Sequence, residues 1–331
     1  MFPIVPTERG LVVEHSVHSR RKVDVRGHGE PPRLVSSPNY VSPSSPFIGT
    51  EALAAGLVTN HGLRTAYVAV HRNVYVPRGA QLDAVDKAVA AWLWSRRLGA
   101  LAGMSASALH GARWIDADLP AEVNRPGRDK IDGVVLHSDV LDGHEVCRRR
   151  GMPVTTAART AFDIGRVPGL ETAVIRVDAL RRATGVGVDA IQAIAERHRG
   201  ARGSRQLRRV LELSDPGAES PQETRTRLLL VTADLPPLKT QIEVRDGRGR
   251  FVARLDMGWP EALVAVEFDG AHHWTDPRQR SRDIDRMAEL EALNWIVVRV
   301  SGEMLRQRPL VILQRIRAAL RERGLLVAET A

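Results

Sequence analysis

The chain has 331 residues, of which 43% are hydrophobic, 26% charged and 4% aromatic, with a formal net charge of +9. This length is sufficient for two or three domains with packed cores. Cys147 is the single cysteine, which excludes an intrachain disulfide and a cysteine-based zinc site. No apolar run approaches the roughly 20 residues of a membrane helix. We therefore expect a multidomain cytoplasmic protein with no membrane partner.

The positive charge comes almost entirely from arginine. The chain contains 48 lysines and arginines, and only Lys22, Lys87, Lys130 and Lys239 are lysines. A basic balance favours an anionic partner such as nucleic acid. A GC-rich coding bias, which enriches arginine and alanine, explains the same composition, so both explanations stay open.

Residues 1–46 predict a disordered, basic tail that is rich in serine and proline. The run over residues 36–46 is mostly serine and proline, without hydrophobic periodicity. Residues 47–79 predict two short helices, the first capped by Thr50, followed by two strands around a turn at Arg72-Asn73. This order is typical of a winged helix. A structural module that binds nothing would show the same order.

Residues 80–200 predict a mixed α/β domain. We expect an apolar helix over 85–94, strands over 121–124 and 134–137, and a further helix that begins near residue 156.

Two histidines in this region stand apart from any chemical motif. Ser105 is the expected cap of a short helix that ends at Gly111, and His110 lies at its last turn. His110 and His137 are isolated in the sequence. A lone histidine of this kind is more often a hydrogen-bonded structural residue than a ligand.

Residues 215–325 predict a last domain with the order α-β-β-β-α-β-α. It opens with Ser220 as helix cap, Pro221 at the first helical position and Glu223 completing a capping box. The elements that follow are strands over 241–245, 251–257, 262–268 and 295–300, and helices over 282–293 and 309–323.

Carboxylates gather at the ends of two of these strands. Asp256 ends one strand, Glu267 and Asp269 end the next, and His273 follows closely. Glu267 and Asp269 are two residues apart, so they point to the same face of the sheet. Carboxylates next to a histidine can hold a divalent metal and activate water. Burying Glu267 at the end of an apolar strand is costly without a metal or a basic partner.

This domain resembles the PD-(D/E)XK nuclease superfamily, and within it the very-short-patch-repair (Vsr-like) endonucleases. The run 266–273 resembles the motif E-x-D-G-x-x-H of that branch. Asp283, Arg286, Leu290 and Trp295 resemble its D-x-x-R-x-x-x-L-x-x-x-G-W segment, except that Asn294 replaces the glycine.

The resemblance implies a role for each acid. Asp256 would be the central ligand of Mg²⁺ or Mn²⁺, Glu267 a second ligand or water activator, and Glu223 the acid of the first helix. Glu219 is a weaker candidate for that last role, and Glu223 could equally be only a capping residue.

The resemblance also implies roles for the remaining motif residues, and one of them, Asp269, differs from the superfamily motif. His273 would act as a general base or contact the phosphate, while Asp283 and Arg286 would support the site or bind phosphate. Arg286 could instead pair with a carboxylate on its own helix. Asp269 occupies the position of the superfamily lysine and cannot supply that cation's charge, so His273 or Arg286 would have to replace it.

The first half resembles AbiEi-like antitoxins. The segment Arg72-Asn73-Val74-Tyr75-Val76 matches their closing R-x-V-Y-V, and residues 105–111 and 153–163 match two further short motifs. The resemblance implies a winged helix that binds operator DNA. Its candidate DNA contacts are His61, Arg64, Arg72 and Arg78, which could also be ordinary surface residues.

These features predict an α/β (α+β) multidomain protein that binds double-stranded or structured DNA and cleaves it with a divalent metal, in DNA repair or in a defence or toxin–antitoxin context. One alternative is a non-catalytic AbiEi-like regulator that uses a degenerate nuclease fold. Another is a fused toxin and antitoxin. A toxin or antitoxin partner and a self-dimer are both compatible with the sequence.

Overall fold

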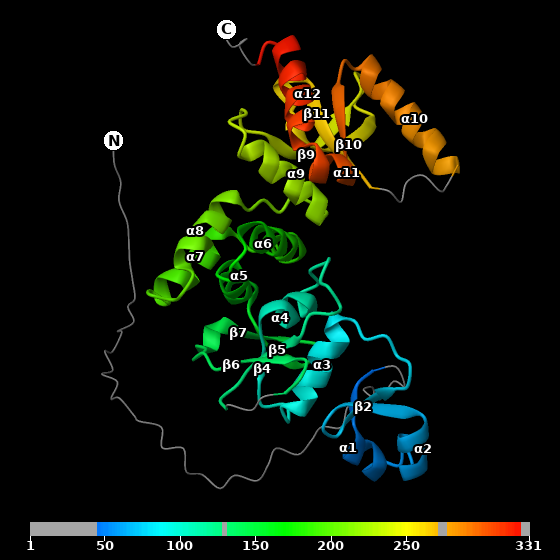
Figure 1. Cartoon of the computed structure of the whole chain (residues 1–331), viewed down its shortest axis with the longest axis vertical. Helices are drawn as coiled ribbons and strands as arrows, with labels where there is room; N and C mark the ends of the chain where they lie inside the picture. The colour runs from blue at the N-terminus through cyan, green and yellow to red at the C-terminus, as the bar shows by residue number, and fades with distance from the viewer. Residues whose placement is uncertain (1–44, 128–130, 271–276, 326–331) are drawn as a thin grey trace, which may run out of the picture. The chain divides into compact units, whose positions relative to one another are not determined.

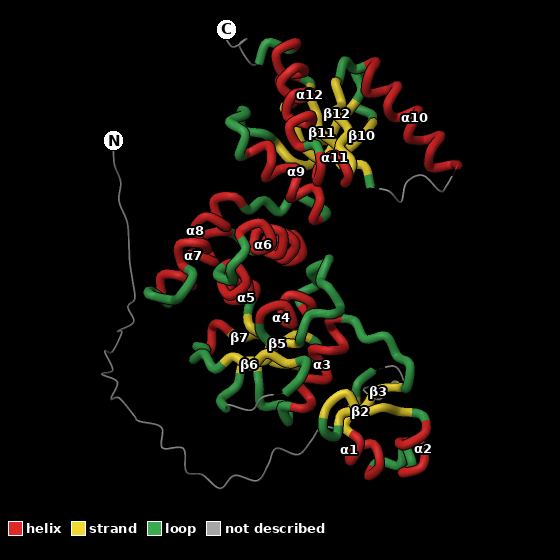
Figure 2. Tube along the Cα trace, viewed as in Figure 1, coloured by secondary structure: helices red, strands yellow, loops and turns green. Residues whose placement is uncertain are grey.

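The computed structural model describes residues 45–127, 131–270 and 277–325. Within these ranges it contains twelve α-helices and three β-sheets (Figures 1 and 2). The mixed α/β class expected from the sequence is thereby confirmed. None of the described helices combines the length and the apolar character needed to cross a membrane. All but the last two residues of the predicted tail, 1–46, lie outside the described ranges.

The N-terminal module consists of two helices and a three-stranded antiparallel sheet in the order β1-β3-β2. Asn73 forms the hairpin turn with a φ of 63°. Its side chain accepts from Thr50 N at 3.1 Å and donates to Thr50 Oγ1 at 2.9 Å. The expected cap at Thr50 is therefore wrong, because Asn73 performs that role from the turn. The elements are β1 (Phe47–Ile48), α1 (Gly49–Ala54), α2 (Asn60–Thr65), β2 (Tyr67–His71) and β3 (Val74–Pro77).

Helix α3 (Ala84–Trp94) is shared between this module and the next domain. It begins with a reciprocal capping box between Asp83 and Asp86. Its Ala90 and Leu93 pack in a cluster with Val74 of β3, while its Ala88 and Ala91 join the core of the middle domain. One helix thus closes two small cores.

The middle domain contains a five-stranded sheet in the order β6-β5-β4-β8-β7, in which the pairs β5/β6 and β4/β8 are parallel. Ser105, the expected cap of helix α4, lies inside the helix, and its Oγ accepts from Glu122 N at 2.9 Å. The strands and helix are β4 (Ala100–Leu101), α4 (Gly103–Leu109), β5 (Ala121–Asn124), β6 (Val134–His137), β7 (Val146–Arg149) and β8 (Met152–Thr155).

Four helices complete the middle domain, and their shared core extends beyond residue 200. Phe162, Val177, Ile191 and Leu207 are buried in one cluster that continues to Leu213. The last helix packs into this core, so the core continues past residue 200, where the predicted domain ends. The helices are α5 (Ala157–Gly165), α6 (Leu170–Thr184), α7 (Val188–Arg197) and α8 (Ser204–Leu213).

The C-terminal domain contains a four-stranded sheet in the order β12-β11-β10-β9, in which only β11 and β12 are parallel. The predicted element order is confirmed, with α11 as an addition that the sequence analysis missed. The elements are α9 (Pro221–Val231), β9 (Lys239–Arg245), β10 (Phe251–Trp259), β11 (Val264–Asp269), α10 (Pro277–Ala292), β12 (Ile296–Ser301), α11 (Gly302–Gln307) and α12 (Pro309–Glu322).

Two apolar clusters hold this sheet between its helices. Leu230 of α9 and Ile316 of α12 pack in one cluster with Trp259 and Val266. Leu290 of α10 packs in the other cluster with Ala265 and neighbouring strand residues. The end of β11 that carries Glu267 and Asp269 therefore lies between α9 and α10.

A buried ion pair joins the middle domain to helix α9. Arg227 Nη2 lies 2.8 Å from Asp178 Oδ2, and the two side chains are 5% and 1% exposed. Thr224 Oγ1 donates to the same carboxylate at 3.1 Å, and Arg227 Nη1 donates to Leu213 O at 2.6 Å. Burial raises the pKa of Asp178 even though Arg227 opposes the rise. Desolvation is thus a large cost at this pair, as is usual for buried ion pairs.

We expect Asp178→Ala to lower the free energy of unfolding by about 3–5 kcal/mol, because it leaves the Arg227 guanidinium buried and unpaired. Urea denaturation followed by circular dichroism measures the change. Glu212→Ala is the matched control, since it removes the partner of Arg209 from an exposed pair and should cost about 0–1 kcal/mol. Equal effects of the two substitutions would contradict the assignment.

Candidate functional site

Asp256 and Glu267 lie side by side on adjacent antiparallel strands. Met257 of β10 is paired with Val266 of β11, and Asp256 and Glu267 are the next positions along the two strands. Phe268 N donates to Asp256 Oδ2 at 2.8 Å. Carboxylates opposite one another on a sheet repel and destabilise it, so this arrangement carries an electrostatic cost.

Glu223 brings a third carboxylate from the first turn of α9. Ser220 caps the helix as expected, and Glu223 N donates to Ser220 Oγ at 3.2 Å. The Glu223 carboxylate accepts from Ser220 Oγ at 2.9 Å and from Glu219 N at 2.8 Å. The carboxylate of Glu223 thus accepts from the backbone N–H of Glu219 and from the hydroxyl of the cap residue, rather than from the backbone N–H of Ser220. Glu223 is 9% exposed, and burial raises the pKa of its carboxyl group.

The strongest electrostatic feature of the site is at Asp256. Burial, followed by the charge of Glu223 and smaller contributions from Glu267 and Glu219, raises the pKa of Asp256 to about 7. The hydrogen bond from Phe268 N opposes the rise without cancelling it. A half-buried carboxylate among other carboxylates is stabilised by any cation that enters the site.

Glu267 is neutralised by helix α10. Arg286 Nη1 lies 2.6 Å from Glu267 Oε1, and Arg286 Nη2 lies 3.2 Å from Glu267 Oε2. The nearest approach of Arg286 to Asp283 on its own helix is longer, at 3.9 Å. The pairing of Arg286 within its own helix, one of the alternatives above, is therefore secondary to its bidentate pairing with Glu267.

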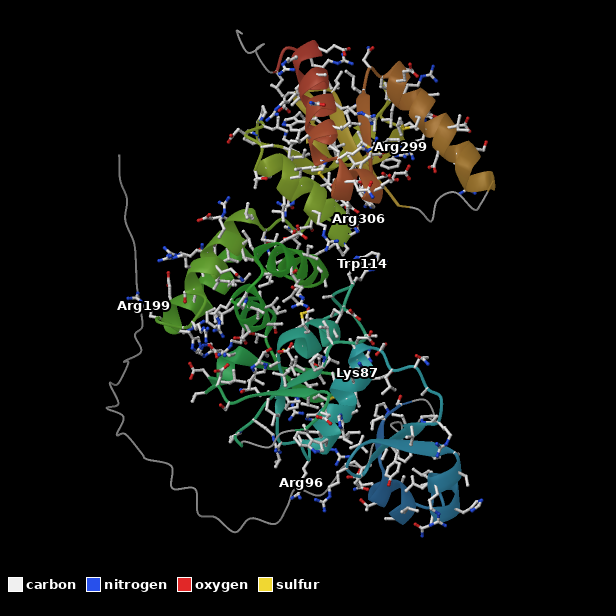
Figure 3. The ribbon with its side chains drawn as sticks, viewed as in Figure 1. Lys87, Arg96, Trp114, Arg199, Arg299 and Arg306 are labelled. Carbon is white, nitrogen blue, oxygen red and sulfur yellow. The ribbon has the colours of Figure 1, made fainter. Side chains whose placement is uncertain are left out.

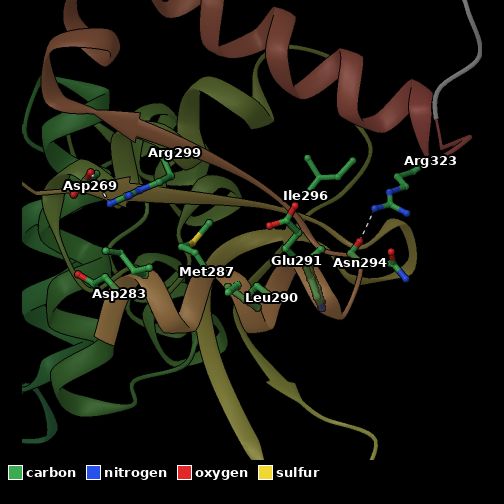
Figure 4. Close-up of a pocket in the computed structure, with 12 residues that line it drawn as sticks. Asp269, Asp283, Met287, Leu290, Glu291, Asn294, Ile296, Arg299 and Arg323 are labelled. Atoms are coloured by element: carbon green, nitrogen blue, oxygen red, sulfur yellow. Dashed lines mark hydrogen bonds and ion pairs between the residues drawn. The ribbon is translucent and has the colours of Figure 1, made fainter. Parts of the chain in front are cut away.

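Asp269 shares a face with Glu267 but has its own partner. Arg299 Nη2 of β12 lies 2.7 Å from Asp269 Oδ2 (Figure 4). The two side chains line a cavity of about 830 Å³ together with Asp283 and apolar residues of α10. Arg299, which was not predicted from the sequence, therefore supplies a cation next to Asp269.

Glu219 is a poorer candidate than Glu223 for the helix acid. Glu219 Oε1 pairs with Arg254 at 2.7 Å and also with Arg182 of α6. Its backbone oxygen accepts at 2.8 Å from Nε1 of Trp114, a side chain that Figure 3 labels. In the described residues Glu223 makes no ion pair, so its charge is the freer of the two. His273, the expected base, lies outside the described residues.

A second acidic group in the middle domain is a structural anchor. Asp142, His144 and Glu145 place ligand atoms within 4.8 Å of one another. Both Glu145 oxygens are already used, by Arg159 at 2.7 Å and by His198 Nε2 at 2.6 Å. This network was not predicted from the sequence because its members are far apart in the chain, although Arg159 lies within the run 153–163.

The candidate DNA contacts of the N-terminal module are all exposed. Arg78 nevertheless donates to three backbone oxygens near the end of α2, at 3.1–3.3 Å. Its guanidinium therefore fastens α2 to the hairpin. His61, Arg64 and Arg72 make no side-chain hydrogen bond in the part of the chain that the structure describes, and their DNA contacts stay a prediction.

No protein-family model matches the chain, and no solved structure matches it. Two curated proteins of Mycobacterium tuberculosis are each 29% identical over 177 residues: "Uncharacterized protein MT2308" of strain CDC 1551 / Oshkosh and "Uncharacterized protein Rv2248" of strain ATCC 25618 / H37Rv. The match covers 54% of this chain and 64% of each relative. The chain thus matches less than two thirds of the length of these relatives, and their names assign no activity.

The raised pKa of Asp256 predicts a specific pH dependence of stability. Well below the usual value of 3.8 the carboxyl group is protonated in both the folded and the unfolded chain and contributes nothing. As the pH rises from the usual value of 3.8 toward about 7, the unfolded chain releases the proton first, so the folded state loses stability. Above pH 7 the full cost is present, on the order of 1–4 kcal/mol.

Asp256→Asn should therefore stabilise the metal-free protein at pH 8 and have little effect at pH 4. Thermal unfolding in the presence of a chelator at both pH values measures the difference. Glu196→Gln, at an exposed position of α7, is the control for loss of one negative charge. A variant that is no more stable than the wild type at pH 8 would show that Asp256 is not electrostatically strained.

Proposed function

We propose that the chain binds DNA through its N-terminal module and cleaves it with a divalent-metal site of the PD-(D/E)XK, Vsr-like type in its C-terminal domain. One observation carries the proposal. Asp256, Glu267 and Glu223 converge from two strands and one helix, and their mutual repulsion helps raise the pKa of Asp256 to about 7. Perturbed carboxylates of this kind are typical of functional sites.

The arrangement of elements supports the two fold assignments. The order α9-β9-β10-β11-α10-β12, with a parallel β11/β12 pair, is compatible with a restriction-endonuclease-like core. The order α1-α2-β2-β3, with β1 completing the sheet, is compatible with a winged helix of the AbiEi-like type.

The residues of the site fit Mg²⁺ or Mn²⁺. Both ions prefer carboxylate oxygens, and Asp256 and Glu223 offer carboxylates that are not held by an arginine in the described structure. When bound, such an ion polarises a phosphate and lowers the pKa of water. Glu267 would join the ligands only if its pairing with Arg286 opened.

The arginines around the acids would perform the rest of the chemistry. Arg286, once released from Glu267, presents a planar guanidinium that binds phosphate oxygens in pairs. Arg299 holds Asp269 and brings positive charge to the place where the superfamily has lysine. This pairing offsets the departure at Asp269 and makes Arg299 the further candidate for stabilising charge on the scissile phosphate.

Asp256→Ala and Glu267→Ala should each reduce metal-dependent DNA cleavage by about 100-fold or more, because a bound metal contributes several kcal/mol of charge stabilisation. DNA affinity should stay unchanged. Cleavage of linear, structured and mismatched duplexes with Mg²⁺ or Mn²⁺ gives the rates. Glu243→Ala, an exposed carboxylate of β9, is the control. Normal cleavage by both site variants would show that Asp256 and Glu267 do not form the catalytic site.

DNA binding by the N-terminal module gives a separate prediction. Arg64→Ala and Arg72→Ala should each weaken DNA binding and reduce the slope of log affinity against log salt by about 1. Arg78→Ala should instead lower thermal stability, because Arg78 fastens α2 to the hairpin. Fluorescence anisotropy at several salt concentrations measures DNA affinity, and thermal unfolding measures the stability of Arg78→Ala. Unchanged affinity of Arg64→Ala and Arg72→Ala would contradict DNA binding by the N-terminal module.

A non-catalytic regulator is the second candidate, and the ion pairs of the site favour it. Glu267 is bound bidentately by Arg286, and Asp269 is bound by Arg299. Two of the predicted catalytic acids are thus neutralised by the protein itself. Calorimetry with Mg²⁺ and Mn²⁺ distinguishes the two candidate functions. A nuclease site binds the ion in the wild type and no longer binds it in Asp256→Ala.

A further inference from the structure

A group of six arginines lies at the end of α7, on the turn that follows it and on the outer face of α8. Residues 197–209 contain these six arginines and no aspartate or glutamate. All six residues are exposed, and Figure 3 labels Arg199 in the turn. We call this group the arginine surface, and its members are Arg197, Arg199, Arg202, Arg205, Arg208 and Arg209.

The charge of the arginine surface is mostly uncompensated. Arg209 Nη1 lies 2.9 Å from Glu212 Oε2, whereas the other five guanidinium groups make no hydrogen bond or ion pair with the described residues. Like charges three and four residues apart on a helix repel one another, and Arg205, Arg208 and Arg209 have this spacing. An anion that binds to this face of α8 would relieve the repulsion.

The backbone beneath the arginine surface is held in place by the segment that follows α5. Gly203 has a φ of 86°, and a Cβ at this position would clash with Arg166 O. Arg166 Nη1 donates to Arg202 O at 3.0 Å, and Gln206 Nε2 donates to Gly165 O at 3.1 Å. The turn is therefore fixed before any partner binds, and binding has to order only the arginine side chains.

The arginine surface offers no apolar or stacking contact. The apolar side of α8 is already used, because Leu207, Val210 and Leu211 are buried in the core of the middle domain. Residues 188–213, which are all described, contribute no exposed large hydrophobic side chain. The same residues include no phenylalanine, tyrosine or tryptophan.

This lack of apolar and aromatic groups narrows the choice of partner. A helix that lies in a membrane needs a free apolar face, and protein interfaces are centred on apolar or aromatic anchors. Single-stranded nucleic acids are bound by stacking their bases on aromatic rings. The partner that remains is a polyanion recognised by its phosphates alone, and guanidinium groups match phosphate oxygens.

We propose that the arginine surface binds the sugar–phosphate backbone of duplex DNA without regard to base sequence. Each DNA strand presents one phosphate per about 3.4 Å of helix axis. Residues three and four apart on a helix have Cβ atoms about 5–6 Å apart, so neighbouring arginines of α8 can contact several phosphates at once. The inference rests on the proposed DNA binding, to which it adds a second surface, and does not depend on the nuclease site.

Fluorescence anisotropy of the full chain with a short duplex of arbitrary sequence, at several salt concentrations, tests the proposal. The variant that combines Arg199→Gln, Arg205→Gln and Arg208→Gln should bind about tenfold or more weakly. The slope of log affinity against log salt should fall in magnitude by about 2–3, because each lost phosphate contact removes about 0.9. Circular dichroism should show an unchanged fold, since the three residues are exposed.

The matched control combines Arg96→Gln, Arg248→Gln and Arg321→Gln. These arginines lie in separate parts of the chain and are exposed, and their side chains make no hydrogen bond or ion pair within the described ranges. The control lowers the net charge by the same amount and should bind the duplex almost like the wild type. An equal loss of affinity in the two triple variants would show that net charge, and not the arginine surface, attracts DNA.

Arg64→Ala and Arg72→Ala distinguish a failure of this inference from a failure of the proposed function. The losses at the two surfaces should add when the variants are combined, because separate sites act independently. Weaker binding in Arg64→Ala and Arg72→Ala alone would contradict the inference and leave the proposed function intact, whereas no duplex binding by the wild type would contradict both. Tighter binding of single-stranded DNA, duplex RNA or phosphatidylserine vesicles, lost in the triple variant, would assign the arginine surface to that partner instead.

Discussion

The repulsion among buried carboxylates around Asp256 is the constraint on which the C-terminal domain depends. The β10/β11 register places Glu267 next to Asp256, and the cap at Ser220 holds Glu223 close to both. None of these three positions can move without breaking strand pairing or a helix start. The fold therefore holds the three carboxylates close together despite the repulsion between them. A cation relieves that repulsion, whereas protonation of Asp256 or the pairing of Glu267 with Arg286 relieves it only partly.

Arginine has two different uses in this chain, and the net charge does not distinguish them. Arg159 and Arg227 are almost fully buried and compensate carboxylates inside the protein. Arg78 fastens backbone carbonyls, and Arg286 neutralises a predicted catalytic acid. Each such pair sums to zero, so the formal net charge of +9 comes from the cations that remain after pairing. The count of 48 lysines and arginines therefore overstates how many cations are available to nucleic acid.

The sequence predicted the local features well and the long-range pairings poorly. Strand alternation, the hairpins and the Ser220 cap depend on neighbours in the chain, and the structure confirms them. Two expected caps were wrong because a competing group came from elsewhere, as Asn73 does for α1. The pairing of Glu267 with Arg286 and the hydrogen bond from Asn124 to Asp139 O join residues 15 or more positions apart. Spacing along a sequence carries no information about such contacts.

Helix α6 carries Asp178, the acid that compensates Arg227 of the C-terminal domain. The C-terminal domain therefore depends on a residue of the middle domain, and neither domain can be exchanged independently of the other. A recombination event that moved residues 215–325 onto another protein would bury a lone guanidinium, unless the new neighbour offered a carboxylate at the same place. Lineages that exchange these domains should change both residues together or replace the pair with apolar side chains.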